Sequence, residues 1–524
     1  MRDSKNILFI PEDPDEASCG RIRRLSTADA NEVIKAIKGD IPDKPKRKCI
    51  SFVPLISIII FCIIYLCPIF PLYPTAHSCL AILVLGGILW GTETIPSYIT
   101  AYLIPLLSVW LKIGYDSETG KRMTASLLAT DIAAKFMDPI IFVFLGSLTM
   151  STGLTKLQIT DRVSSFALSK ISKRPRIVLL TIMSLNFATA AFLSNIASTT
   201  LLLTFSLPII RSLDPDEPFI KALLLGLAWS GNAGGMVTTI ASVQNILAIK
   251  YINESGAASI SFIEWMGFAA PTAVVVLMFY YVYTIFRYRT KLVTISVDTK
   301  SDTYGEWTWK HTFTCVVTVS TIILWALQET FASFFGHVGI TALIPLVALF
   351  STKILTSEDF GHLRWSTLAL MGGGIALGEA MKVSGLLVLL SDAITDAVGN
   401  IPIWVVTLIF LIVEGVLVSI INHTSAAAIL FPVLNTIGIN LGSPTIFLTL
   451  SALMIGNAQL FHISSFPTAL VSGVQRHRVN DHTTLEPEPF LPGPEFFFAG
   501  WPIVFGSVFI IASVGYGLVI AMKL

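Results

Sequence analysis

Long apolar runs, each close to or above the length that crosses a lipid bilayer, recur along this chain. A transmembrane helix needs about 20 consecutive apolar residues. Three such runs are FVPLISIIIFCIIYLCPIF at 52–70, AHSCLAILVLGGILWGTETIP at 76–96 and FGSVFIIASVGYGLVIAM at 505–522. Only 13% of the 524 residues are charged, whereas a soluble domain carries about 25%. The sequence therefore predicts an all-α polytopic membrane protein.

The apolar segments predict about eleven transmembrane helices. Their approximate ranges are 51–72, 76–95, 97–113, 138–154, 218–250, 264–286, 312–334, 338–355, 365–390, 444–472 and 498–522. Two further segments, 177–211 and 401–436, have polar residues in their middles, and we interpret them as re-entrant hairpins. Lys and Arg gather on the cytosolic side of a membrane. The segments rich in Lys and Arg all lie on the cytosolic side only if the N-terminus is cytosolic and both hairpins return to the side from which they enter.

Three short motifs recur in the same order along the chain. The matching pairs are Lys156 with Lys382, Asn195 with Asn422, and the triplet GNA at 231–233 with GNA at 456–458. The offsets are 226 (382 − 156), 227 (422 − 195) and 225 (456 − 231) residues. This constancy predicts an internal repeat, and an odd number of helices before the second copy would invert it. Inverted repeats with broken helices are typical of secondary transporters.

These patterns divide the chain into four expected parts. Residues 1–50 are basic and lack the features of a signal peptide, so we expect a cytosolic, disordered tail. The other parts are a first half at 51–290 (hairpin 177–211, broken helix 218–250), a cytosolic linker at 291–311, and a second half at 312–524 (hairpin 401–436, broken helix 444–472).

Each repeat carries two polar interruptions. They are SNIASTT (194–200), SGNAGGMVTTIASVQN (230–245), NHTSA (422–426) and IGNAQLFHISSFPT (455–468). Backbone leaves helical geometry at membrane depth only where protein or a watery cavity satisfies its polar groups. A helix that starts there directs unpaired N–H groups and a positive dipole end to the midplane, which favours an anion. The hydroxyl, amide and carbonyl oxygens beside it suit Na⁺.

The motifs resemble those of the divalent anion/sodium symporters. The two tips look like that family's Ser-Asn-Thr signatures, although here they read SNI at 194–196 and INH at 421–423. LLGLAWSGNAGGMVTTIASVQNILA resembles its broken fifth helix, HISSFPTA its broken tenth, and WGTETIP its second-helix motif. The likeness covers about residues 50–524 and is greatest to fungal low-affinity phosphate transporters. It implies an elevator-type movement and a homodimer, and the tail is too short for the SPX domain that such relatives often carry.

The resemblance also implies the site residues. The anion would contact the tips at Ser194, Asn195, Ser198, Asn422, His423 and Thr424. One Na⁺ would lie among Asn195, Ala241, Ser242 and Asn245, and a second among Asn422, Ser464, Ser465 and Thr468. His423 is either a hydrogen-bonded packing residue or a group that donates to phosphate or couples transport to pH.

Charged residues inside the apolar regions are few. No Arg falls in the predicted apolar core, so we expect helix ends rather than a guanidinium to bind the anion. Glu379 and Lys382 lie three residues apart on a predicted helix, a spacing at which side chains meet. We therefore expect them to form an internal pair.

Together these features favour a secondary active transporter for inorganic phosphate, coupled to Na⁺ and without another cofactor. The alternatives are a di- or tricarboxylate or sulfate sodium symporter and, in another class, an anion channel or nutrient receptor without coupled transport. The expected partners are a small anion and membrane lipids, with no nucleic acid, in the plasma membrane or a vacuolar or other endomembrane. An enzyme is disfavoured because the sequence offers no nucleophile–base or metal motif.

Overall fold

A computed structural model describes residues 52–67, 69–116, 121–169, 173–256, 258–295, 305–327, 332–398, 401–479 and 485–524. These residues belong to one compact unit, Ile50–Leu524. The predicted tail at 1–50 and residues 296–304 of the predicted linker lie outside the described residues.

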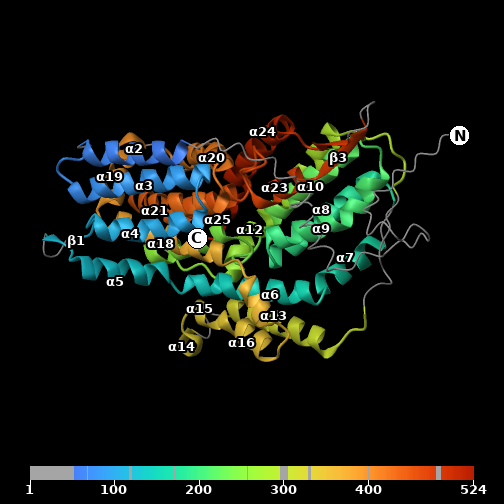
Figure 1. Ribbon diagram of the computed structural model, residues 1–524, viewed down its shortest axis with the longest axis horizontal. Coiled ribbons are helices and arrows are strands. Elements are labelled where there is room, and N and C mark those ends of the chain that lie inside the picture. The colour runs from blue at the N-terminus through green and yellow to red at the C-terminus, as the bar shows by residue number, and fades with distance from the viewer. Residues whose placement is uncertain are drawn as a thin grey trace, which may run out of the picture. The chain divides into compact units, whose positions relative to one another are not determined.

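The described residues are mostly helical (Figure 1). The helices of the first half are α2 (Val53–Leu66), α3 (Pro74–Thr92), α4 (Ser97–Trp110), α5 (Ala125–Phe136), α6 (Ile140–Lys156), α7 (Ile159–Ser169), α8 (Pro175–Phe192), α9 (Asn195–Ser212), α10 (Pro218–Gly234), α11 (Val243–Ser255) and α12 (Phe262–Arg287). Those of the second half are α13 (Trp309–Ala326), α14 (Ala332–Phe335), α15 (Val338–Thr341), α16 (Leu343–Ser351), α17 (Ser357–Gly361), α18 (Trp365–Val383), α19 (Leu386–Val398), α20 (Ile403–Ile420), α21 (His423–Asn440), α22 (Pro444–Ile455), α23 (Phe466–Ser472), α24 (Gly493–Ile510), the π-helical turn η1 (Ile511–Gly515) and α25 (Tyr516–Ala521).

Two short antiparallel ribbons interrupt the all-α pattern that the sequence predicted. Strand β1 (Tyr115–Asp116) pairs with β2 (Lys121–Arg122), and β3 (Gln475–Val479) pairs with β4 (Leu485–Pro489). Both ribbons lie in polar connections between helices, where the chain reverses between apolar segments.

Several helices are long and apolar enough to cross a membrane. Among the described residues six such spans occur, or seven if the bent pair of α18 and α19 counts as one. The six are Pro74–Thr92, Ala125–Lys156, Pro175–Phe192, Phe262–Arg287, Ile403–Ile420 and Gly493–Ala521. This confirms the prediction of a multi-pass helical membrane protein.

The segment before the predicted span 138–154 is helical, where the sequence reading placed a connection. Helix α5 begins after Thr124, whose hydroxyl accepts a hydrogen bond from the Leu127 N–H at 3.3 Å. Together α5 and α6 form a 32-residue apolar stretch. The charges of Asp131 and Lys135 interrupt the apolar pattern, which is why the sequence alone did not predict this helix.

The two halves repeat one order of elements. In the first half α6 to α11 follow each other, and in the second half α18 to α23 do the same, with breaks at matching places. Gln158 joins α6 to α7 with a φ of 54°, and Gly385 joins α18 to α19 with a φ of 81°. A left-handed residue thus ends the first helix of each copy.

The two expected hairpins differ in their packing. Segment 177–211 falls on α8 and α9, which pack along each other and against α10, and which lie side by side in Figure 1. Segment 401–436 falls on α20 and α21, which contact each other at few points. Helix α20 packs instead on α22 and α24, while α21 packs on α11, α18, α19 and α22.

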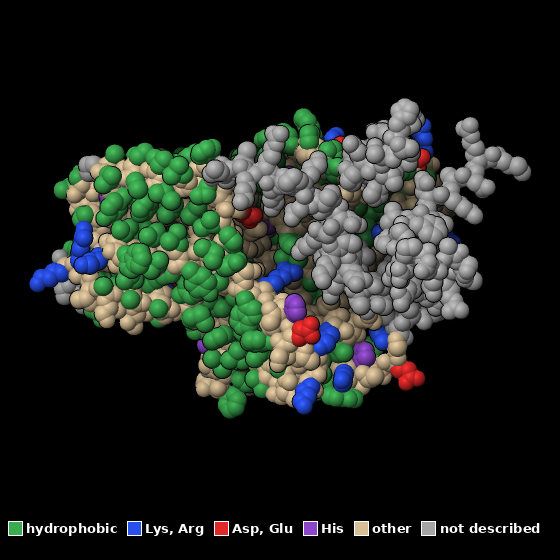
Figure 2. All heavy atoms as spheres, in the orientation of Figure 1, with side chains coloured by type: hydrophobic (Ala, Val, Ile, Leu, Met, Phe, Trp, Pro, Cys, Tyr) green, Lys and Arg blue, Asp and Glu red, His purple; other side chains and the backbone are tan. Residues whose placement is uncertain are grey.

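Exposed hydrophobic side chains cover the outer helices. Figure 2 shows them gathered over the region that Figure 1 labels α2, α3 and α4. On α2 the exposed residues include Leu55, Ile58 and Ile63. Soluble proteins rarely expose contiguous apolar patches of more than a few hundred Å². This surface is therefore suited to contact lipid.

Candidate functional site

Four helices begin at one cavity of about 350 Å³. They are α9, α11, α21 and α23, and each follows one of the polar interruptions in the sequence. The cavity residues from these helix starts are Ser194, Asn195 and Ile196 (the first tip), Ala241, Ser242, Val243 and Gln244 (the first break), Asn422, His423 and Thr424 (the second tip), and Ser465 and Phe466 (the second break). First-turn N–H groups have no intrahelical acceptor, so the cavity receives four positive helix ends.

At the first tip, Ser194 is the N-cap of α9. Its Oγ accepts a hydrogen bond from the Ile196 N–H at 3.3 Å. Asn195 donates through Nδ2 to Asn232 Oδ1 at 3.1 Å. Its own amide oxygen is then the group that remains for the cavity. Ser198, expected here as well, is fully buried behind the tip and donates to Asn186 Oδ1 at 2.6 Å.

At the first break, two buried oxygen atoms lack a partner. Ser242 precedes α11 but its side chain does not cap the helix, and among the described residues its Oγ has no hydrogen-bond partner. Asn245 lies one turn further, behind the cavity wall. Its Nδ2 donates to the carbonyls of Gly235 and Thr238 at 2.8 and 2.7 Å, while its Oδ1 is also unpartnered in the described structure.

Gly235 leaves room beside these atoms. A Cβ at Gly235 would lie 2.7 Å from Ser242 Oγ and 3.5 Å from Asn195 Cβ. The hydroxyl of Ser242 and the side chain of Asn195 therefore face the same small space. The residues expected to hold the first Na⁺ are brought together here, with Asn245 approaching from behind.

At the second tip, Asn422 is the N-cap of α21. Its Oδ1 accepts a hydrogen bond from the Thr424 N–H at 3.1 Å. The buried His423 bonds through Nε2 to the Ala458 carbonyl at 3.0 Å. A carbonyl only accepts, so Nε2 carries the proton, and in a neutral ring Nδ1 is an acceptor. A neutral His423 therefore has no second N–H to donate to phosphate.

At the second break, the expected cation ligands are bonded to protein. Ser465 Oγ caps α23 by accepting from the Thr468 N–H at 3.3 Å, in a capping box. Thr468 donates to the His462 carbonyl at 3.0 Å. Ser464 donates to the Ser419 carbonyl at 2.6 Å. Of these three residues, only Ser465 lines the cavity.

Asn232 links the two halves behind the cavity. Its Oδ1 accepts from Asn195, and its Nδ2 donates to Gln459 Oε1 and Ser465 Oγ, both at 2.8 Å. The sequence showed Asn232 as part of the repeated GNA triplet, but the two acceptors of its Nδ2 lie more than 220 residues away in the second half. No local pattern indicates such a contact.

The cavity also has a wall that sequence reasoning missed. Glu93 and Ser97 reach it from the α3–α4 junction, and Arg364, Ser366 and Thr367 reach it from the start of α18. One arginine, Arg364, therefore lines the cavity, although the sequence analysis placed no arginine in the apolar core. Arg364 directly precedes the predicted span 365–390, and the packing of α18 brings it to the cavity.

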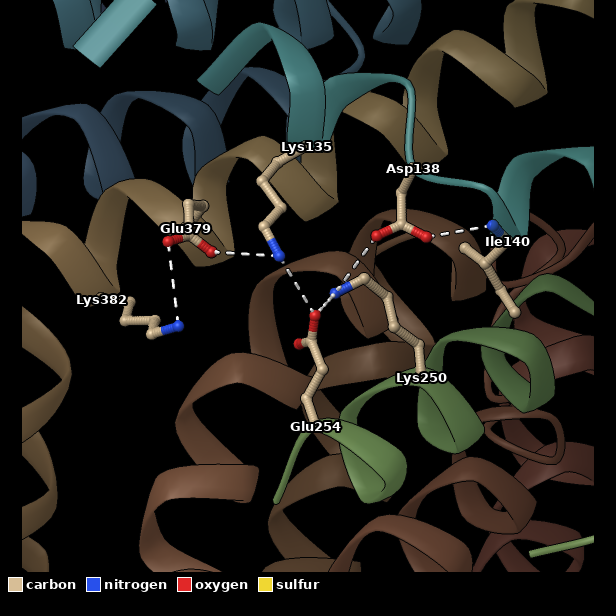
Figure 3. Close-up of polar contacts among 7 residues, drawn as sticks. All are labelled: Lys135, Asp138, Ile140, Lys250, Glu254, Glu379 and Lys382. Carbon is tan, nitrogen blue, oxygen red and sulfur yellow. Dashed lines mark hydrogen bonds and ion pairs between the residues drawn. The ribbon is translucent and has the colours of Figure 1, made fainter. Parts of the chain in front are cut away.

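A charged cluster lies apart from the cavity, between α5, α11 and α18 (Figure 3). Lys250 pairs with Glu254 at 2.8 Å, and Glu379 lies 3.9 Å from both Lys135 and Lys382. The expected pair of Glu379 with Lys382 is thus present, but the Lys382 side chain is 71% exposed rather than internal. Such an exposed pair contributes at most about 1 kcal/mol, so we assign it no role in binding.

The described residues contain no group of three or more His, Cys, Asp or Glu side chains that could hold a metal ion. The cavity instead offers helix ends, amide and hydroxyl groups, one guanidinium and one carboxylate. These groups suit reversible binding of an anion and of a cation with oxygen ligands.

Several known proteins are similar in sequence to a large part of this chain. The sequence profile of the citrate transporter family matches residues 87–456. The chain is 32% identical over 371 residues to the inorganic phosphate transporter PHO87 of Saccharomyces cerevisiae, covering 71% of this chain and 40% of PHO87. It is 31% identical over 372 residues to the low-affinity phosphate transporter PHO90 of the same yeast, covering 70% of this chain and 41% of PHO90. The chain thus spans less than half the length of these yeast relatives.

A bacterial relative and two solved structures are also similar. The sodium-dependent dicarboxylate transporter SdcS of Staphylococcus aureus is 25% identical over 464 residues, covering 82% of this chain and 86% of SdcS. The YdaH transporter of Alcanivorax borkumensis and MtrF of Neisseria gonorrhoeae each give a TM-score of 0.50 at 12% identity over 82% of this chain, covering 99% and 96% of those chains. At this identity the two structures show a shared fold only.

Proposed function

The chain belongs to the citrate transporter family, and we propose that it is a secondary active transporter that moves inorganic phosphate across a membrane together with Na⁺. Membership in a family of transporters confirms the prediction that the chain is not an enzyme. The observation that carries the proposal is the meeting of four helix starts at one cavity. Backbone N–H groups and helix dipoles at such starts favour a compact anion.

Phosphate as the substrate rests on the yeast relatives and on the chemistry of the tips. PHO87 and PHO90, both phosphate transporters by name, are more than 30% identical to this chain. The tips offer the hydroxyl groups of Ser194 and Thr424 as donors. Phosphate presents several oxygens that accept hydrogen bonds at once, which suits a site built from many donors.

Sodium coupling rests on the first break. Na⁺ is a hard cation that prefers oxygen ligands, and a buried oxygen without a partner costs free energy. Ser242 Oγ and Asn245 Oδ1 are two such atoms, and the Asn195 side chain faces the space that Gly235 leaves beside Ser242. A cation bound there would satisfy the orphaned oxygens. In the second expected set, Ser465 Oγ already accepts hydrogen bonds from the Thr468 N–H and from Asn232 Nδ2, so we propose the first break as the principal sodium site.

We further propose that transport moves the two tips and two breaks as one body against the remaining helices, in an elevator-type movement, with eleven spans and two re-entrant hairpins in inverted repeats. Asn232 joins the start of α9 to the start of α23, which supports the movement of these two elements together. A homodimer in the plasma membrane or an endomembrane, with a cytosolic N-terminus, completes the proposal.

A di- or tricarboxylate is the second candidate substrate. The cavity of about 350 Å³ falls within the range of sites for organic molecules, and SdcS is a dicarboxylate transporter by name. Labelled uptake separates the candidates. Phosphate uptake should be driven by a Na⁺ gradient, should fall when choline replaces Na⁺, and should resist excess succinate, citrate or sulfate. Saturable uptake of succinate or citrate with no uptake of phosphate would contradict the proposed substrate.

A further inference from the structure

Arg364 places a positive charge at the cavity from outside the repeated tips and breaks. It immediately precedes α18, and the next cavity residues, Ser366 and Thr367, lie in the first turn of that helix. The start of α18 therefore also faces the cavity, as does that of α4 at Ser97. Arg364 is the single Lys or Arg among the cavity-lining residues that the structure describes.

The guanidinium of Arg364 has no anionic partner in the described part of the chain. Its one contact is with the ring of Phe466, whose centroid lies 5.6 Å from the guanidinium carbon. Glu93 lines the same cavity, but it makes no ion pair with Arg364 within 4.0 Å. Other cations are paired, as in Lys221 with Glu495 at 3.1 Å. Arg364 is thus a half-buried charge without compensation.

The position of this charge is electrostatically unfavourable while the cavity holds no anion. A helix N-terminus carries a partial positive charge that disfavours a nearby cation. Arg364 adjoins the start of α18, and its cavity also receives the helix starts of both tips and both breaks. A partly buried cation without a counter-charge destabilises a protein. A negatively charged occupant of the cavity would remove this cost.

We propose that Arg364 binds the transported anion directly and helps to determine which anions the protein accepts. The inference rests on the proposed function, that the cavity carries an anion, and adds a residue to it. A guanidinium matches two oxygens of a phosphate with two parallel N–H donors, and its charge never titrates away. The face of Phe466 holds the planar group against the start of α23. Arg364 therefore ties an anion in the cavity to both α18 and the second break.

Three variants of the full chain in proteoliposomes test this role. Arg364→Gln should raise the phosphate KM roughly tenfold to a hundredfold, because a hydrogen bond to a charged group is lost. Arg364→Lys should raise KM less, because it keeps the charge but not the paired donors. Arg289→Gln is the matched control: Arg289 is exposed, lies 5.9 Å from the Phe286 ring and is remote from the cavity lining. Its KM should equal that of the wild type.

Thermal unfolding in detergent distinguishes binding from a merely structural role. Without phosphate, Arg364→Gln should unfold at the same or a higher temperature than the wild type, because an uncompensated charge is gone. With phosphate, the variant should lose most of the stabilisation that the wild type gains. A lowered melting temperature without phosphate, together with a wild-type KM, would overturn the proposal.

A failure of the proposed substrate can be distinguished from a failure of the proposed role of Arg364. If the wild type is stabilised by sulfate, succinate or citrate but not by phosphate, the proposed function fails, and the Arg364→Gln variant is then compared with the wild type on that anion. A weaker response of the variant to the same anion supports Arg364 as a ligand. An equal response overturns it, whichever anion is bound.

Discussion

The first break, between α10 and α11, and the second break, between α22 and α23, use the same amino acid in opposite ways. Ser465 caps its helix and accepts a second hydrogen bond from Asn232 at 2.8 Å. Ser242 caps nothing, and its hydroxyl has no partner within the described residues. Three positions later, Thr468 is hydrogen-bonded, whereas the Oδ1 of Asn245 is not.

This difference separates the attraction of an anion from the binding of a cation, two properties that the two breaks would otherwise share. Both breaks start a helix at the cavity, so both contribute a positive end that attracts an anion. Among the described residues, the first break has two buried side-chain oxygens without a hydrogen-bond partner, Ser242 Oγ and Asn245 Oδ1. The two halves thus share the order of their helices and breaks, but they use the side-chain oxygens at the breaks differently.

The largest expected effect comes from the tips, where the halves should behave alike. Asn195→Ala removes the bond to Asn232, and Asn422→Ala removes the cap of α21. Each should abolish phosphate uptake while the protein still reaches the membrane. Uptake and surface labelling measure this, with Asn253→Ala, an exposed position on α11, as the control. Normal uptake in either tip variant would remove that asparagine from the site.

We expect the Ser242→Ala and Ser465→Ala variants to differ in the Na⁺ dependence of their phosphate uptake. Ser242→Ala should raise the Na⁺ concentration for half-maximal uptake roughly tenfold, because a ligand to a charged group is lost. Ser465→Ala should shift it little, because its hydroxyl is already committed to protein. The Na⁺ dependence of phosphate uptake measures both. Equal shifts in the two variants would show that both breaks bind the cation.

The smallest expected effect is on stability, and here Ser465→Ala should have a larger effect than Ser242→Ala. Ser465→Ala loses a helix cap, which lowers the free energy of unfolding by about 1 kcal/mol. Ser242→Ala removes a buried hydroxyl without a hydrogen-bond partner among the described residues, so stability should stay the same or rise slightly. Thermal unfolding of the purified chain without Na⁺ or phosphate compares them. Greater destabilisation by Ser242→Ala would mean that its hydroxyl has a partner in solution.

The general architecture was readable from the sequence because each part of it has a local cause. Apolar runs of about 20 residues predicted the spans, and polar clusters within such runs predicted where helices break. Asn195 and Asn422 drew attention because amides inside an apolar segment require a partner. The structure brings both to one cavity.

What the sequence could not supply are contacts between distant segments. Nothing near Arg364 in the sequence indicates that α18 places it against Phe466, and nothing near Asn232 indicates Ser465. Local pattern also cannot tell whether a polar side chain lines a cavity or is bonded behind its wall. Ser198 and Ser464, expected as ligands, belong to the second kind. The helix α5 was missed because two charges obscured its apolar character.

The amide of Asn232 has a consequence for how this chain is assembled. Both acceptors of its Nδ2, Gln459 and Ser465, are supplied by the C-terminal half. A first half synthesised alone would hold a buried amide donor with nothing to receive it. The first half is therefore not a self-sufficient unit, and during synthesis its interior is completed only when the second half has been made.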